Sequence, residues 1–207
     1  MTDQGQPACS ALFGCGDIPA EIEDAYNEWY NTEHTPDMLT VPGVLNGRRF
    51  RAIAGAPRYA ALYDLRSLNV MTSPEWQAIV ARRRDNPSEA HKSIRPRFQN
   101  FTRYHMDKAY PDHDKPLALA ERRLGALHGT GFDVTAFAAW SAERRDGLLD
   151  TTLFVSDRGQ WVAMMDLRAS VTPRWFATLA GSLAEAQKAA GGVPAQTTLY
   201  EQIFPTE

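Results

Sequence analysis

A histidine near the end of a predicted helix carries most of the chemistry that this sequence suggests. Residues 20–39 read as helical, and His34 lies close to the C-terminal end, just before Pro36. Tyr30 is four residues before His34, so both side chains share one helix face, and Tyr26 extends the same stripe. An imidazole beside aromatic rings could act as a general base near neutral pH. The structural alternative is a helix-terminal histidine that bonds a backbone carbonyl and packs against aromatic rings.

Arginine and tyrosine side chains on the next two predicted strands could complete a site around this histidine. Arg49 and Arg51 alternate along residues 47–53, so both point to one face of the strand. Such an arginine can bind a carboxylate or an enolate-like oxygen, and a surface salt bridge is the alternative. Tyr59 and Tyr63 share a face of the following strand. Their hydroxyls could stabilise an oxyanion, or the rings could simply belong to the core.

These residues define the predicted site. The expected catalytic residues are His34, Tyr30 and Arg49. The expected substrate-binding residues are Tyr26, Trp29, Tyr59, Tyr63 and Arg51. No glycine-rich phosphate-binding motif and no nucleophile elbow occurs, and no histidine or cysteine spacing matches a defined metal site. We therefore expect an enzyme that uses no cofactor and no metal.

Composition narrows the classes of partner. The chain has 207 residues, 43% of them hydrophobic, and a net charge of −3, so it lacks the basic field that nucleic acid or anionic lipid requires. It has no apolar run of about 20 residues and no apolar signal segment at its polar N-terminus. The two cysteines, Cys9 and Cys15, are too few for a disulfide framework. We expect a cytoplasmic protein that binds a small-molecule substrate, and self-association into a homo-oligomer stays open.

The sequence contains an internal repeat whose two copies have diverged. Residues 59–66 and 161–168 are both alternating, strand-like runs that end in Asp-Leu-Arg. Each is followed by a Ser-Pro or Thr-Pro signal and then by a tryptophan, Trp76 or Trp175, at the start of a predicted helix. A period of about 100 residues is too long for a solenoid and fits a duplicated domain.

Each half predicts the element order β-α-β-β-α-β, which is ferredoxin-like. In the first half the expected strands are residues 9–18, 47–53, 58–65 and 97–105, and the expected helices are residues 20–39 and 74–85. In the second half the expected strands are residues 124–128, 151–155, 161–167 and 197–203, and the expected helices are residues 134–145 and 173–190. Two such sheets can bury the faces that their helices leave uncovered. The fold class is therefore α+β, with two ferredoxin-like halves that pair as a pseudo-dimer in one barrel.

The expected boundaries follow from the repeat and from a polar, proline-containing stretch between the halves. Residues 1–107 form the half that carries the predicted site, residues 108–123 are a linker, and residues 124–207 form a degenerate second half. Arg145 takes the place of His34 when Trp140 is aligned with Trp29, and the Val-Pro-Gly turn at residues 41–43 has no counterpart. We therefore expect one working site and a second half that serves as its structural partner.

The first half also resembles a known family. Residues 28–39 read Glu-Trp-Tyr-Asn-Thr-Glu-His-Thr-Pro-Asp-Met-Leu, followed by Val-Pro-Gly-Val and, at residues 48–50, by Arg-Arg-Phe. Over about residues 8–106 this pattern is similar to the EthD-like group of the dimeric α/β-barrel superfamily. The resemblance implies a barrel made from two four-stranded sheets, with pockets between the sheets and their helices. That superfamily includes cofactor-free monooxygenases, cyclases, isomerases, decarboxylases, heme enzymes and proteins without known activity, so the fold does not choose a reaction.

The leading functional hypothesis is proton transfer by His34 on an aromatic or apolar carbonyl or hydroxyl metabolite. Such chemistry belongs to a lyase, isomerase or dehydratase step in catabolism or secondary metabolism. The first alternative is a cofactor-free monooxygenase, because an enolate or phenolate made in the same pocket could react with oxygen. The second alternative is a non-catalytic ligand-binding or assembly protein. The third is heme binding, for which His128 is a weak ligand candidate.

Overall fold

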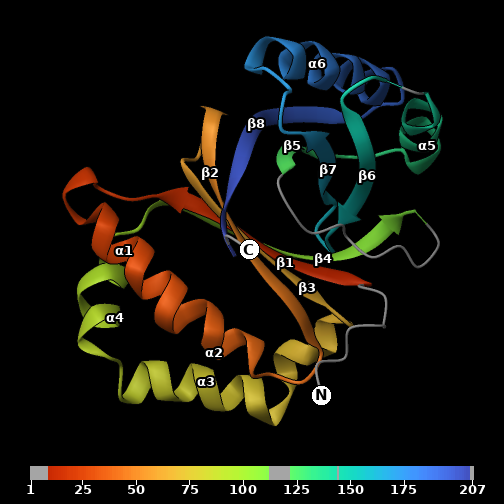
Figure 1. Ribbon diagram of the computed structural model, residues 1–207. Helices are drawn as coiled ribbons and strands as arrows, with labels where there is room; N and C mark the ends of the chain where they lie inside the picture. The colour runs from red at the N-terminus through yellow and green to blue at the C-terminus, as the bar shows by residue number, and fades with distance from the viewer. Residues whose placement is uncertain (1–8, 112–121, 144, 206–207) are drawn as a thin grey trace.

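A closed antiparallel barrel forms the centre of the molecule (Figure 1). The computed structural model describes residues 9–111, 122–143 and 145–205. The strands are β1 (Ser10–Asp17), β2 (Val44–Gly55), β3 (Tyr59–Leu65), β4 (Gln99–Tyr110), β5 (Arg122–Thr130), β6 (Leu148–Val155), β7 (Gln160–Arg168) and β8 (Val193–Phe204). The α-helices are α1 (Glu23–Trp29), α2 (Thr35–Leu39), α3 (Pro74–Asp85), α4 (Glu89–Ile94), α5 (Val134–Ala142) and α6 (Pro173–Ala189).

The two halves of the chain have the same strand order within the barrel. The complete order is β1-β3-β2-β8-β5-β7-β6-β4, so each half contributes a sheet in which its fourth, first, third and second strands are neighbours. Antiparallel pairing of β2 with β8 and of β4 with β6 joins the two sheets. Helices α1 to α4 cover one side of the barrel, and α5 and α6 cover the opposite side (Figure 1). The α+β class and the barrel-type architecture are confirmed, and the origin of the two halves by duplication stays a prediction.

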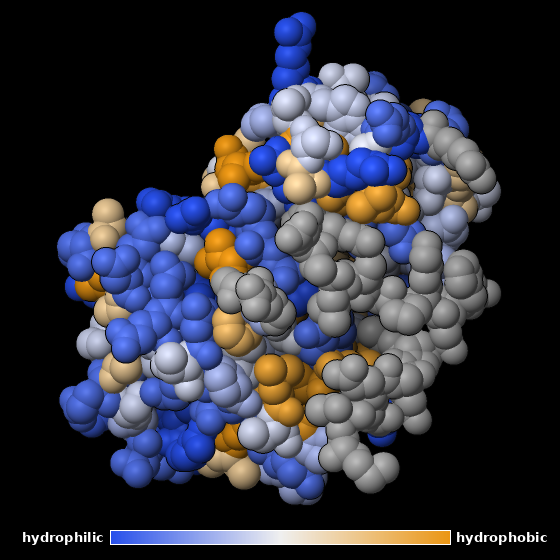
Figure 2. Space-filling model, viewed as in Figure 1, coloured by the Kyte–Doolittle hydropathy of each residue, from blue (hydrophilic) through white to orange (hydrophobic). Residues whose placement is uncertain are grey.

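The hydrophobic core consists of three clusters, because one face of each sheet lines the barrel interior and helices cover the other face. One cluster fills the barrel interior, with Phe13, Phe50, Phe154 and Tyr200 among its largest side chains. A second cluster lies between the first-half helices and the outer face of their sheet, and a third lies in the equivalent place in the second half. On the face shown in Figure 2, the surface on the side of α1 and α4 is mainly hydrophilic, with isolated apolar groups. The apolar side chains of these helices therefore point toward the sheet.

The repeated helix starts predicted from the sequence form by the same local mechanism. The Ser73 hydroxyl accepts a hydrogen bond from the Trp76 amide at 3.2 Å, and the Thr172 hydroxyl accepts one from the Trp175 amide at 3.2 Å. A proline occupies the first turn of both helices. Each cap stabilises its helix by about 1 kcal/mol, which explains why the Ser/Thr-Pro-Xaa-Trp pattern marks both helix starts.

The turn at Gly43 was expected to have no counterpart in the second half, and the structure shows that it has one. Gly43 and Gly147 occupy equivalent turns, with φ angles of 91° and 90°. Their carbonyls accept hydrogen bonds from the amides of Arg66 and Arg168, both at 2.9 Å. Since a side chain is strained at such a φ angle, glycine is required in both turns. The sequence comparison missed the match because the proline before Gly43 has no counterpart in the second half.

Several element boundaries also differ from the predictions. The helix expected over residues 20–39 is divided into a 3-10 turn, α1, a π turn and α2. Helix α4 was not predicted, and its start is capped by Ser88. Strand β4 continues into the expected linker as far as Tyr110, and the linker residues 112–121 lie outside the described residues. Within the described part of the chain, none of the helices has the length and apolar character needed to cross a membrane.

Candidate functional site

The helix that carries the candidate residues widens into a π turn at Tyr30–His34. The amide of Thr35 donates to the carbonyl of Tyr30, five residues earlier, instead of four as in an α-helix. This turn gathers three rings, with centroid distances of 4.9 Å between Trp29 and His34 and 4.5 Å between Tyr30 and His34. π turns inside helices are rare and are frequent at functional sites. The local geometry therefore supports His34 and Tyr30 as members of one site.

A cavity of about 80 Å³ lies beside these rings, between the helices and the outer face of the sheet. It is lined by Leu12, Gly14, Trp29, Tyr30, His34, Ala61, Tyr63, Arg95, Phe98, Phe101 and Arg103. One water needs about 10–15 Å³ of such space, so the cavity admits a small ligand group. Strands β1, β3 and β4 supply its floor, and the helical segment from Trp29 to His34 supplies one wall.

His34 has the properties of a neutral proton acceptor. Its Nδ1 is buried and has no hydrogen-bond partner among the described residues. Burial lowers the pKa of His34 well below 6.5, and the nearby charge of Arg83 lowers it further. His91, Arg95 and Arg49 contribute in the same direction. The imidazole is therefore uncharged at neutral pH, and it carries a buried, unpartnered nitrogen on a residue that lines the cavity.

The neighbouring aromatic residues offer hydrogen-bond donors. Trp29 is 2% exposed, and its indole N–H has no partner among the described residues. Burial raises the pKa of Tyr63 to about 12, and its hydroxyl lies 3.3 Å from the hydroxyl of Thr35. Burial also raises the pKa of Tyr30, with a smaller contribution from Tyr63. Both tyrosines stay protonated at neutral pH and can donate to an oxygen anion.

Arg49 does not line the cavity but contacts the ring of Tyr30, which does. Its side chain is 1% exposed, and its guanidinium carbon lies 4.4 Å from the ring centre of Tyr30 and 4.9 Å from that of Tyr26. The guanidinium donates to the side-chain oxygens of Asn31 at 2.5 Å and Asn27 at 2.8 Å. Arg49 does not line this cavity, so its expected catalytic role stays a prediction, and its contacts favour a positioning role through Tyr30.

The structure places three of the expected substrate-binding residues outside the cavity. Arg51 is 47% exposed and forms an ion pair with Glu201 at 2.7 Å, because alternate strand residues beyond the helices reach solvent. The hydroxyl of Tyr59 donates to the carboxylate of Glu23, at the far end of α1. Tyr26 packs against Tyr59, with ring centres 4.9 Å apart. Tyr26 and Tyr59 thus support α1 on the sheet.

Sequence reasoning missed the part of the site that comes from residues after 85. Arg95, Phe98, Phe101 and Arg103 also line the cavity, and they come from a 3-10 turn, the residue after it and β4. The ring of His91 on α4 is half-buried and lies 5.5 Å from that of Trp29. The signal for α4 was present as Ser88 followed by an acidic residue, a common helix start.

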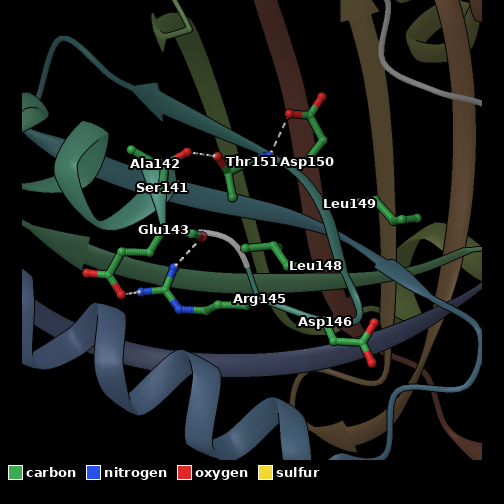
Figure 3. Close-up of a pocket in the computed structure, with 9 residues that line it drawn as sticks. All are labelled: Ser141, Ala142, Glu143, Arg145, Asp146, Leu148, Leu149, Asp150 and Thr151. Atoms are coloured by element: carbon green, nitrogen blue, oxygen red, sulfur yellow. Dashed lines mark hydrogen bonds and ion pairs between the residues drawn. The ribbon is translucent and has the colours of Figure 1, made fainter.

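A larger cavity, of about 470 Å³, lies in the second half between the end of α5 and the start of β6 (Figure 3). Its polar groups bond to one another. Arg145 donates to the carbonyl of Trp140 at 2.6 Å and to the carboxylate of Glu143 at 2.7 Å. The hydroxyls of Ser141 and Thr151 are 2.5 Å apart. Among its described lining residues none has a buried polar side-chain atom without a partner, so this cavity gives no comparable sign of a reaction site.

The described residues do not fit a heme group. The cavity beside His34 is far below the roughly 300–1,000 Å³ of drug-sized ligand sites. His128 lies inside the barrel, 4% exposed, with its ring 5.5 Å from that of Phe13. The larger cavity has no histidine, cysteine, methionine or tyrosine among its described lining residues. We therefore derive no step through heme.

Comparison with known proteins finds solved structures with a similar fold. The sequence matches no protein-family model and no curated protein, so the EthD-like resemblance stays a prediction. Among solved structures, a "putative chlorite dismutase" is 12% identical with a TM-score of 0.60, covering 96% of both chains. An "anthrone oxidase-like protein" is 8% identical with a TM-score of 0.59, covering 97% of this chain and 93% of the other.

A third solved structure also combines low sequence identity with a similar fold. A "putative monooxygenase" from Fusobacterium nucleatum subsp. nucleatum is 11% identical with a TM-score of 0.55, covering 94% of both chains. Identities at this level show a shared fold and leave the reaction open. The barrel, the strand order and these likenesses together show that the chain has a fold of the dimeric α/β-barrel type.

Proposed function

We propose that this protein is a cofactor-independent enzyme in which His34 removes a proton from a small aromatic or apolar carbonyl or hydroxyl compound. The observation that carries the proposal is the buried, unpartnered Nδ1 of His34, a residue that lines the cavity. Buried polar atoms almost always have partners, so each exception requires an explanation. An acidic C–H or O–H group of a bound substrate supplies that partner.

The charges around His34 favour a reaction that creates an anion. The charged groups that lower its pKa are all cationic, and three of them are Arg83, Arg95 and Arg49. The same positive field stabilises an enolate or phenolate that forms next to the imidazole. Charging a buried imidazole is unfavourable in isolation, but the new imidazolium lies beside the new anion, and their attraction offsets the cost.

The surrounding donors complete the proposed mechanism. The indole N–H of Trp29 has no partner among the described residues, and the hydroxyls of Tyr63 and Tyr30, which bond each other, can turn toward an oxygen that gains negative charge. When the electron pair of the broken C–H bond moves toward the carbonyl, the proton resides on His34 and can return at another atom. This sequence describes an isomerase, lyase or dehydratase type of reaction.

Oxygen chemistry in the same pocket is the second candidate. It is favoured by the shared fold with an "anthrone oxidase-like protein" and a "putative monooxygenase". An electron-rich carbanion made by His34 is the species that would meet oxygen. Both candidates start with the same proton transfer and differ only in what consumes the anion.

We also propose that the second half is a structural partner. Arg49 pairs with Ala61 across the β2–β3 ladder, and Leu153 pairs with Ala163 at the equivalent place in the β6–β7 ladder. The cation behind the first-half site is thus replaced by an apolar residue, and Leu153 is fully buried in a hydrophobic cluster. This difference supports one site per chain.

The test of the proposed function is deuterium exchange under argon, followed by NMR on a panel of aromatic carbonyl compounds that includes anthrone and phenylpyruvate. The proposal predicts exchange of the acidic C–H of at least one compound above the rate in buffer. Binding without exchange across the panel would identify a non-catalytic binding protein and contradict the proposal. Repeating the reaction in air with an oxygen electrode separates the two enzymatic candidates, because only the monooxygenase consumes oxygen.

A further inference from the structure

Two arginines share the mouth of the His34 cavity. Arg95 comes from the 3-10 turn at Arg95–Arg97, and Arg103 comes from β4. The guanidinium of Arg95 lies over the rings of Phe98 and Phe101, with 4.8 Å and 4.9 Å from its carbon to the ring centres. This stacking holds the planar group in place while leaving its N–H edge free.

Neither arginine is neutralised by a carboxylate within the part of the chain that the structure describes. The ion pairs of the first half involve other arginines, such as Arg82 and Arg83 with Asp37 and Arg97 with Glu21. Burial lowers the pKa of Arg95, and the neighbouring charge of Arg103 lowers it further. Two close cations repel each other until an anion lies between them.

Two other residues that line the same cavity carry polar atoms without hydrogen-bond partners among the described residues. The indole N–H of Trp29, which is 98% buried, and the Nδ1 of His34 belong to cavity-lining residues and bond to no described residue. The residues that line one cavity therefore include two exposed arginines, several aromatic side chains, and a tryptophan and a histidine that each carry an unpaired polar atom. Such an arrangement fits a short molecule with an anionic end and a reactive polar end.

We propose that the substrate carries a carboxylate, which binds Arg95 and Arg103 at the mouth while its acidic C–H group reaches His34. This inference rests on the proposed function and names its substrate class, a small aromatic carboxylic acid with an activated proton. Guanidinium groups bind planar carboxylates through paired N–H donors, which gives both affinity and orientation. The carboxylate thus fixes which carbon faces the imidazole.

Phenylpyruvate has the required features and serves as the probe for the chemical step. His34 accepts the proton from the CH₂ group between the ring and the ketone. The electron pair of that C–H bond forms a C=C bond, and the ketone oxygen becomes an enolate oxygen. In D₂O a deuteron returns to the same carbon, so the net result is isotope exchange and neither an oxidant nor a reductant is consumed.

The binding test uses the whole protein and matched ligands. Benzoate is compared with benzamide and with phenyl phosphate by NMR titration, for wild type, Arg95→Gln and Arg103→Gln. Arg97→Gln is the matched control, because Arg97 lies in the same turn but pairs with Glu21 outside the cavity. We expect benzoate to bind most tightly, with about a tenfold loss for each of the first two variants and no loss for the control.

Several outcomes overturn the inference. Equal binding of benzoate and benzamide, no carboxylate binding at all, unchanged binding in both arginine variants, or tighter binding of phenyl phosphate would each do so. The variant His34→Gln separates this inference from the proposed function. If it keeps arginine-dependent benzoate binding and retains full phenylpyruvate exchange, the carboxylate site stands and the base assignment fails. If phenylacetone exchanges as fast as phenylpyruvate in wild type, and His34→Gln abolishes both, the base stands and the carboxylate site fails.

Discussion

Arg49 is a buried cation that is held by neutral groups. Its guanidinium donates to the amide oxygens of Asn27 and Asn31 and lies between the rings of Tyr26 and Tyr30. Among the described residues it forms no ion pair, in contrast to Arg51 two residues later on the same strand. A buried charge keeps its ionised form only where hydrogen bonds and ring faces replace water. Arg49 therefore ties the π turn to the barrel and adds positive charge behind Tyr30.

We predict that Arg49→Leu lowers the free energy of unfolding by about 3 kcal/mol, because it leaves two partly buried amide oxygens without donors and removes a buried cation from two ring faces. The measurement is urea unfolding at pH 7, with Arg51→Gln as the matched control. Arg51 is exposed and paired at the surface, so its loss should cost less than about 1 kcal/mol. Equal effects of the two substitutions would show that Arg49 does not hold the turn.

At this scale the sequence predicted part of the site and missed the rest. The spacing of Tyr30 and His34 on one helical stripe placed both residues correctly at one cavity. Arg95 and Arg103 could not be found in this way, because their position depends on the register of β4 against β1. Arg51 lies outside the cavity for a related reason. Strand alternation gives the face of a side chain but not the point along the strand where the covering helices end.

The π turn is the feature of the helical element that matters most for the site. Residues Tyr30–His34 contain an i to i+5 hydrogen bond, so the turn holds one more residue than an α-helical turn. That extra residue lets Trp29, Tyr30 and His34 gather around one cavity while α1 and α2 both stay packed on the sheet. Propensity alone predicts a continuous helix over this segment, and tertiary packing decides otherwise.

Removal of one exposed residue from this turn should restore α-helical geometry and rotate His34 away from the cavity. We predict that deletion of Thr32 preserves the helical circular dichroism signal and reduces catalysed exchange to the level seen without His34. Thr32→Ala is the matched control, because it removes only the hydroxyl bond to the carbonyl of Glu28 and keeps the turn. The role of the turn would be refuted by a folded deletion variant with undiminished exchange.

The closed barrel is the feature of the whole molecule that the sequence predicted best. The Asp-Leu-Arg repeat and the Ser-Pro and Thr-Pro helix starts predicted two equivalent halves, and both halves have the same strand order. The pairing of β2 with β8 and of β4 with β6 could be expected only from the family resemblance, because no local pattern encodes contacts between strands that lie far apart in the sequence. Inside the barrel the halves differ, and His128 occupies the place that Cys15 has in the first half.

His128 should make the fold sensitive to acid. Burial lowers its pKa from 6.5 to about 4, and its Nδ1 lies 3.3 Å from the hydroxyl of Tyr104. Below pH 6.5 the unfolded chain binds a proton at this histidine and the folded chain does not. The free energy of unfolding therefore decreases as the pH falls from about 6.5 toward 4, by about 3 kcal/mol for this group. His34 contributes in the same direction.

The measurement is urea unfolding between pH 7.5 and 4.5, conditions chosen at about the limits of that window. We predict that His128→Gln has a smaller decrease in unfolding free energy across the range than wild type, whatever its stability at pH 7. Parallel curves for the two proteins would mean that His128 is not held neutral inside the barrel.

The claim that His34 is the proton acceptor is tested most directly by the rate of phenylpyruvate deuterium exchange in three proteins. These are wild type, His34→Gln and His91→Gln, the last being a matched control whose ring also packs against Trp29 but does not line the cavity. Loss of a general base costs on the order of 10²- to 10⁴-fold in rate, so His34→Gln should lose at least about 100-fold. His91→Gln should stay within a few-fold of wild type. Undiminished exchange in His34→Gln would contradict the assignment of His34 as the base.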